Sequence, residues 1–129
     1  MPKGISSRLS SFENLNGLKG QGGKANQKVK GKAFEALKAG GSRILLDVKG
    51  SGVIEKMWFT VNDRSPEMLR SLRFQIFWDD AEEPAVDVPF GDFFCIGLGK
   101  TAAFENALFS NPEGRSFNCY VPMPFKMAQ

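Results

Sequence analysis

The fold is decided by an alternating run of apolar and polar residues, Leu72-Arg73-Phe74-Gln75-Ile76-Phe77-Trp78. Successive side chains of an extended chain point to opposite faces, so every second residue of this run falls on one side. The residues on that side are Leu72, Phe74, Ile76 and Trp78. The run therefore predicts a β-strand with one buried, strongly hydrophobic face.

Similar alternation before and after this run predicts further strands, at residues 44–48, 53–61, 85–89 and 117–123. A turn is expected at Gly50-Ser51-Gly52, another at residues 111–114, and a single helical turn at residues 65–70. For residues 102–108 the sequence pattern does not decide the secondary structure. The pattern is all-β with long loops, most like a jelly-roll β-sandwich.

Two of the expected strands carry a mixed face that is a candidate for function. In the strand at 53–61, Trp58 shares its side with Lys56 and Thr60, opposite the apolar side. In the strand at 117–123, Asn118 and Tyr120 lie opposite the apolar residues. Rings beside amide and hydroxyl groups are a typical composition for ligand contact.

An acidic and aromatic segment, Trp78 to Phe94, follows the decisive run directly. It holds six carboxylates and four aromatic rings within seventeen residues. Carboxylates accept hydrogen bonds from sugar hydroxyls, and rings stack on the apolar faces of sugars, so the composition suggests the rim of a carbohydrate site. The alternative is an acidic, solvated turn between two strands.

Composition excludes several classes of site. The chain has 129 residues, enough for about one domain, and no His, which removes imidazole metal ligands and Ser-His-Asp triads. Cys95 and Cys119 are too few for a disulfide framework and are expected to be buried free thiols. No apolar run of membrane-spanning length and no secretory h-region is seen, so we expect a soluble chain, with no membrane partner and no encoded compartment.

The N-terminal part is basic, with ten Lys or Arg against three acidic residues up to residue 49. Its Gly- and Lys-rich stretch at residues 17–32 has no apolar period and predicts a long loop. We therefore divide the chain into a basic arm at residues 1–41 and a β-sandwich domain at residues 42–129. Lysines can contact phosphates, but no aromatic residues interleave with these, which favours a solvated loop over a nucleic-acid partner.

Two glycine motifs resemble nucleotide-binding loops, but neither is accompanied by the neighbouring sequence that such a loop requires. Gly20-Gln21-Gly22-Gly23-Lys24-Ala25 fits a loose dinucleotide pattern but lacks the strand and helix that must flank it. Gly97-Leu98-Gly99-Lys100-Thr101 ends like a phosphate-binding loop, yet Phe94 stands where that motif requires Gly. The acidic segment fits no EF-hand spacing. We expect no cofactor and no metal.

A series of motifs in order along the chain, from about Ser6 to the C-terminus, resembles the domain of unknown function 2961. These motifs are Ser11-Phe12-Glu13-Asn14, Gly22-Gly23-Lys24-Ala25-Asn26, Leu46-Asp47-Val48-Lys49-Gly50-Ser51-Gly52-Val53-Ile54, Met57-Trp58-Phe59-Thr60, Phe77-Trp78-Asp79, the run from Glu83 to Phe94, and the run from Phe109 to Phe125. Members of that family classed as glycoside hydrolase family 172 act on furanosides, including α-fructofuranosides, difructose anhydrides and D-arabinofuranosides.

The resemblance implies a tandem jelly-roll protein that assembles into trimers or hexamers. It also implies a retaining mechanism with two Glu residues, which in the family lie beyond the Pro-Met-Pro-Phe motif; no residue here inherits those catalytic roles. We therefore expect the chain to be the N-terminal portion of a furanoside-acting glycoside hydrolase, with an incomplete first jelly roll. The alternative is a non-enzymatic jelly-roll module for carbohydrate binding or assembly.

Six residues are candidates for substrate contact. Asp92 could bind sugar hydroxyls, and Phe93 and Trp58 could stack on the sugar ring. Polar atoms would come from the remaining three candidates, Asp79, Asn118 and Tyr120. For the two stacking rings the alternative is a place in the core, and for Asp92 it is a capping role in its own turn.

Overall fold

The computed structural model of the chain describes residues 4–26, 29 and 31–129. It divides into two compact units, the first of Met1–Gly50 with Met127–Gln129 and the second of Ser51–Lys126. The lysine-rich stretch at 17–32 belongs to the first unit, and its residues 27, 28 and 30 lie outside the described residues. None of the helices in the described part of the chain is long and apolar enough to cross a membrane.

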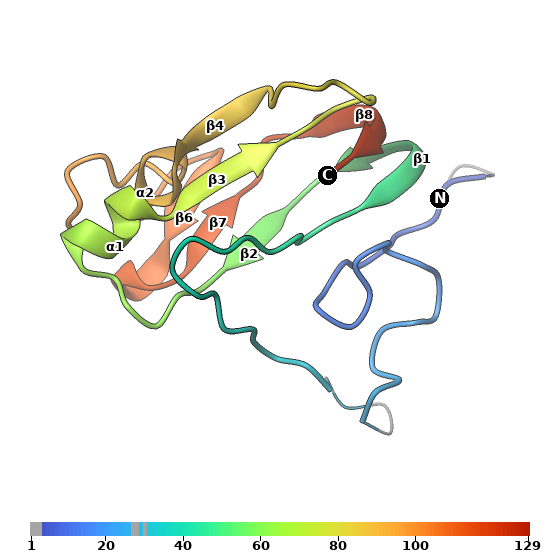
Figure 1. Cartoon of the computed structure of the whole chain (residues 1–129), viewed down its shortest axis with the longest axis horizontal. Helices are drawn as coiled ribbons and strands as arrows, with labels where there is room; N and C mark the ends of the chain where they lie inside the picture. The colour runs from blue at the N-terminus through green and yellow to red at the C-terminus, as the bar shows by residue number, and fades with distance from the viewer. Residues whose placement is uncertain (1–3, 27–28, 30) are drawn as a thin grey trace. The chain divides into compact units, whose positions relative to one another are not determined.

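The strands are paired mostly in antiparallel sheets, which confirms the predicted all-β class (Figure 1). The largest sheet has the order β2-β7-β6-β5, formed by β2 (Met57–Phe59), β7 (Phe117–Cys119), β6 (Phe109–Asn111) and β5 (Phe104–Glu105). Two smaller sheets pair β3 (Arg73–Ile76) with β4 (Val86–Pro89), and β1 (Val48–Ile54) with β8 (Met123–Ala128). Three short helices complete the described part of the chain: α1 (Pro66–Ser71), α2 (Phe90–Phe93) and the 3₁₀ helix η1 (Pro112–Gly114).

The core of the second unit is a cluster of phenylalanine rings. Phe94 and Phe117 are fully buried and meet edge to face, with their centroids 5.8 Å apart. Phe59 of β2 meets Phe94 and also Phe74 of β3, each at 5.8 Å. Edge-to-face pairs contribute roughly 0.5–1.5 kcal/mol each beyond the area they bury. The cluster therefore holds one face of the four-stranded sheet against β3 and α2.

The strand predicted from the opening run is confirmed as β3, in which Phe74 and Ile76 are buried while Arg73 and Gln75 are exposed. The predicted helical turn is also confirmed, as α1. Its N-cap is Ser65, whose hydroxyl accepts a hydrogen bond from the backbone N–H of Met68. The preceding carboxylate, Asp63, accepts a hydrogen bond from the backbone N–H of Ser65, which lowers the pKa of Asp63.

The acidic and aromatic segment divides into three parts rather than one rim. Asp79 and Asp80 both have positive φ and form a tight turn that the N–H of Ala81 closes on the carbonyl of Trp78. Residues 86–89 form β4, as expected from the short strand at 85–89. The phenylalanines then form helix α2, which the sequence pattern did not predict, and bury Phe90 and Phe94 in the core.

The predicted turn at Gly50-Ser51-Gly52 is wrong, because these residues lie inside β1. A Cβ built on Gly52 would come within 2.7 Å of Cζ of Phe125, so the glycine makes room for a ring. The strand predicted at 44–48 is wrong as well, because β1 begins at Val48. The strand predicted at 117–123 is likewise two strands, β7 and β8, which lie in different sheets.

Both cysteines are free, as predicted. Cys119 is buried on β7, and burial raises the pKa of its thiol. Cys95 is exposed, contrary to expectation, because it has positive φ in the turn directly after α2.

Replacing Gly52 with Ala should lower the free energy of unfolding of the second unit by about 1–3 kcal/mol, because the new methyl group overpacks against Phe125. Urea denaturation followed by circular dichroism measures this change. The matched control is Ser51→Ala on the neighbouring, exposed position of the same strand, which should leave the midpoint nearly unchanged. Equal midpoints for the two variants would show that Gly52 is not a packing position.

Candidate functional site

A row of side chains crosses the four-stranded sheet on the face opposite the phenylalanine cluster. Trp58 of β2 is paired with Asn118 of β7, which is paired with Ser110 of β6. Ser110 is in turn paired with Glu105 of β5. Residues directly opposite each other in antiparallel strands project to the same side. We call this side the outer face.

Trp58 is the most prominent side chain of the outer face, with 52% of its surface exposed. Its indole N–H donates a hydrogen bond of 2.8 Å to the hydroxyl of Ser116, two residues before Asn118. A hydrogen bond at the edge of the ring restricts its rotation, while about half of the side chain is exposed. An indole held in this way presents a flat, oriented surface to a ligand.

Tyr120 lies on the same face, on the far side of Asn118 from Ser116. It is 37% exposed, and the ammonium group of Lys56 lies 5.1 Å from the centre of its ring, a cation–π contact. Leu108 is beside it, because the N–H of Tyr120 donates to the carbonyl of Leu108 at 2.7 Å. Lys56 therefore brings a positive charge to an otherwise aromatic and apolar edge of the outer face.

Asn118 lies in the middle of the row and is almost fully buried, with 4% of its surface exposed. Its amide nitrogen donates to the carbonyls of Ser110 and Ser116, at 3.3 and 3.1 Å, and lies 3.1 Å from the Ser116 hydroxyl. The hydroxyl of Ser116 thus contacts both the amide nitrogen of Asn118 and the indole N–H of Trp58. Asn118 therefore positions the loop before β7, and through Ser116 it positions the indole.

The outer face offers hydrogen-bonding groups and rings but no acid–base pair. Among the eight residues of the row and its margins described above, the only carboxylate is that of Glu105, which is exposed. Glycoside hydrolysis commonly uses two carboxyl groups that flank one bond, and the groups named on this face are of kinds that bind a ligand. No group of three or more Cys, Asp or Glu side chains within the described residues is placed to hold a metal ion.

The structure brings three of the six predicted contact residues together: Trp58, Asn118 and Tyr120. The other three lie elsewhere in the second unit. Both carboxylate oxygens of Asp92 lie 2.5 Å from Nη1 of Arg70. A carboxylate oxygen of Asp79 accepts the backbone N–H of Lys126 at 2.8 Å. Phe93 is half-buried, and its ring centroid lies 4.7 Å from that of Phe74, in the core.

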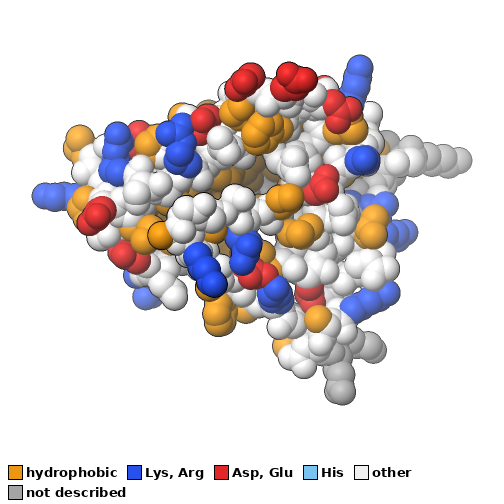
Figure 2. All heavy atoms as spheres, in the orientation of Figure 1, with side chains coloured by type: hydrophobic (Ala, Val, Ile, Leu, Met, Phe, Trp, Pro, Cys, Tyr) orange, Lys and Arg blue, Asp and Glu red, His pale blue; other side chains and the backbone are white. Residues whose placement is uncertain are grey.

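Sequence reasoning did not single out Ser116 or Lys56, which position the exposed rings. Lys56 had a usable signal, because it alternates with Trp58 and so shares its face in an extended chain. Ser116 had the same signal relative to Asn118. Figure 2 shows one view of the surface, in which exposed hydrophobic side chains lie among charged side chains of both signs. Exposed rings alone would therefore not have marked the outer face.

Comparison with known protein families identifies a match. The family described as GH172 domain-like matches residues 26–129, which is most of the chain and includes the whole second unit. A search among curated proteins finds no match. The family match confirms the resemblance to glycoside hydrolase family 172 that the sequence motifs indicated.

Replacing Asn118 with Asp should destabilise the second unit by about 1–3 kcal/mol at neutral pH, because a buried carboxylate would then face three oxygen atoms. Those surroundings should raise the pKa of the new carboxyl in the folded state. The loss of stability should therefore grow as the pH rises above the unfolded-state pKa of Asp, about 3.9, and should shrink below that pH.

Urea denaturation at several pH values measures the effect. The control is Asn106→Asp, because the Asn106 side chain only accepts hydrogen bonds from the N–H groups of Leu108 and Phe109, and a carboxylate keeps that role. If the two variants lose the same stability with the same pH dependence, Asn118 does not have the positioning role described above.

Proposed function

Because the chain belongs to the GH172 domain-like family, we propose that it is part of a glycoside hydrolase that acts on furanosides, of the α-fructofuranoside, difructose anhydride or D-arabinofuranoside class. In this proposal the outer face of the four-stranded sheet binds the sugar. Catalysis by the retaining mechanism is assigned to the full-length protein, and no catalytic residue is assigned to this chain. The predicted assembly into trimers or hexamers belongs to the same proposal.

The observation that carries the proposal is the arrangement around Trp58. An exposed indole is oriented by Ser116, and its cross-strand neighbour Asn118 is a buried amide whose nitrogen contacts that serine and the carbonyl of Ser110. A flat apolar surface fixed in this way matches the C–H face of a sugar ring, and fixing it in advance reduces the entropy lost on binding. Glu105, at the far end of the row, is exposed and supplies acceptor oxygens for hydroxyl groups.

The six predicted contact residues take different parts in this proposal. Trp58 stacks on the sugar, Tyr120 forms the edge of the site beside Lys56, and Asn118 positions the indole through Ser116. Contacts from Asp92, Phe93 and Asp79 stay predictions. Asp92 would first have to exchange its contact with Arg70 for a contact with sugar, and the Phe93 ring would have to leave Phe74.

A second candidate function is non-enzymatic carbohydrate binding or assembly, in which the oriented indole of the outer face holds a sugar that is not cleaved. The two candidates share the sugar-binding face and differ in whether the full-length protein cleaves the bound sugar. Hydrolysis of aryl α- and β-furanosides by the full-length protein separates them. Release of the aryl group supports the hydrolase, and binding without release supports the module.

Replacing Trp58 with Ala should weaken binding of a methyl furanoside by about tenfold or more, equivalent to about 1.4 kcal/mol, because the stacking surface is removed. Isothermal titration calorimetry with methyl α-D-arabinofuranoside and with a methyl fructofuranoside measures this loss. The control is Leu98→Ala, which removes a 94% exposed apolar side chain of the same unit away from the outer face. Equal affinity of the Trp58→Ala and Leu98→Ala variants would exclude the outer face as the sugar site.

A further inference from the structure

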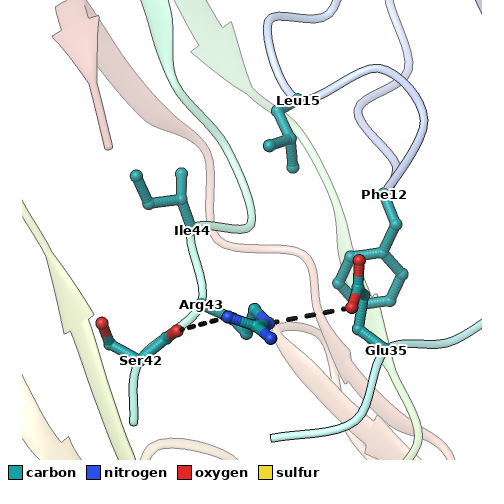
Figure 3. A pocket seen from close by; sticks show the side chains of 6 residues that line it. All are labelled: Phe12, Leu15, Glu35, Ser42, Arg43 and Ile44. Atoms are coloured by element: carbon teal, nitrogen blue, oxygen red, sulfur yellow. Dashed lines mark hydrogen bonds and ion pairs between the residues drawn. The ribbon is translucent and has the colours of Figure 1, made fainter.

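The first unit contains a hollow that the proposed function does not use. It has a volume of about 300 Å³ and is lined by Phe12, Leu15, Glu35, Ser42, Arg43 and Ile44 (Figure 3). The lining is divided by chemistry, with three apolar side chains and three polar ones. Its volume is at the small end of the range of ligand sites, which fits a single sugar unit or a molecule of that size.

The walls of the hollow are held by hydrogen bonds between segments far apart in the sequence. The hydroxyl of Ser10 donates to the carbonyl of Leu45 at 2.9 Å, and the N–H of Asp47 donates to the carbonyl of Leu15 at 2.9 Å. These bonds fasten the loop that carries Phe12 and Leu15 to the segment that carries Arg43 and Ile44. The hollow is therefore formed by a defined arrangement of these two segments, the first contributing apolar lining and the second both apolar and polar lining.

Glu35 and Arg43 face each other across the polar side of the hollow (Figure 3). One carboxylate oxygen of Glu35 contacts Nζ of Lys32, and the other lies 3.7 Å from Nε of Arg43. The contact with Lys32 and the charge of Arg43 lower the pKa of Glu35, so its carboxylate is ionised at neutral pH. A separation of 3.7 Å is too long for a hydrogen bond, so the pair attracts without saturating its hydrogen-bonding groups.

A donor and an acceptor at this separation match a pair of neighbouring hydroxyl groups. One hydroxyl can donate to the Glu35 carboxylate while the next accepts from the Arg43 guanidinium, which has five donors in a fixed planar fork. Within the described part of the chain, the hydrogen bond seen for that guanidinium is a 3.3 Å contact with the carbonyl of Ser42. The Phe12 ring, which lines the same hollow, provides a surface for the apolar face of the same ligand.

We propose that this hollow is a second carbohydrate site, which binds one neutral sugar unit through a vicinal diol held between Glu35 and Arg43, with the sugar's apolar face on Phe12. A purely apolar ligand would make no hydrogen bond with the Glu35 carboxylate or with the Arg43 guanidinium. A neutral polyol satisfies both groups at once. This site is lined by residues of the first unit alone, so it can bind sugar whether or not the outer face does.

The test is a two-dimensional ¹H–¹⁵N NMR titration of the whole chain with methyl α-D-arabinofuranoside, and separately with its 2-deoxy analogue, which lacks one hydroxyl of the 2,3-diol. Binding in the hollow should shift amide signals of residues 12–15 and 42–44. Arg43→Lys keeps the charge and removes the planar fork, and Glu35→Gln removes the ionised acceptor. Each variant should weaken this binding by about tenfold or more. Glu67→Gln, an exposed carboxylate of α1, is the matched control and should change nothing.

The outcomes separate this site from the outer face. Shifts in residues 12–15 and 42–44 that survive Trp58→Ala, and are lost in Glu35→Gln and with the deoxy sugar, support the second site. Shifts confined to the neighbourhood of Trp58 overturn the second site and leave the proposed function standing. Shifts in the hollow that persist in both Glu35→Gln and Arg43→Lys overturn the diol mode. No shifts in either place would overturn both proposals for this sugar class. Unchanged chemical shifts elsewhere in each variant verify that it is folded.

Discussion

The packing of phenylalanine rings on one face of the four-stranded sheet is the constraint on which the rest of the second unit depends. Phe59 and Phe117 come from the sheet, Phe74 from β3, and Phe90 and Phe94 from the segment at α2. These rings bury one face of strands only two or three residues long, which could not form a stable sheet without such cover. Since the inner face is occupied, the outer face is where Trp58 and Tyr120 project.

Hydrogen bonds then fix the positions of side chains on the outer face. Ser116 connects the Asn118 amide to the Trp58 indole, so a buried polar group determines the position of an exposed ring. This arrangement separates two roles that the sequence alone assigned to one class of contact residue. Trp58 and Tyr120 are surfaces that a ligand can touch, whereas Asn118 is a support behind them. The proposal that a sugar binds this surface rests on membership of the GH172 domain-like family.

Much of the fold could be predicted from the local alternation of apolar and polar residues. The wrong predictions concern segments whose structure depends on contacts between residues far apart in the sequence. The pattern from Leu72 to Trp78 predicted β3 because its buried face is read within a single strand. Gly52 looked like part of a turn, and only the approach of the Phe125 ring explains why it lies in a strand. The phenylalanines after Pro89 looked like a sugar-binding rim because single-sequence reading cannot distinguish an aromatic ring that binds a ligand from one that packs in the core.

The candidate site was predictable in the same partial way. Trp58 and Asn118 could each be assigned to a mixed face, but their pairing across β2 and β7 depends on a register that sequence does not state. The hollow in the first unit was not predictable, since Glu35 and Arg43 lie in a segment without periodicity and meet Phe12 only through the fold.

The most direct test of the central claim is to observe the two indole N–H signals of the chain by NMR while a methyl furanoside is added. We predict that the signal of Trp58 shifts with increasing sugar, while that of Trp78, whose ring stacks on Phe125 with centroids 6.3 Å apart, stays in place. A shift of Trp78 alone, or no shift of Trp58 at saturating sugar, would contradict the assignment of the outer face as a sugar-binding surface.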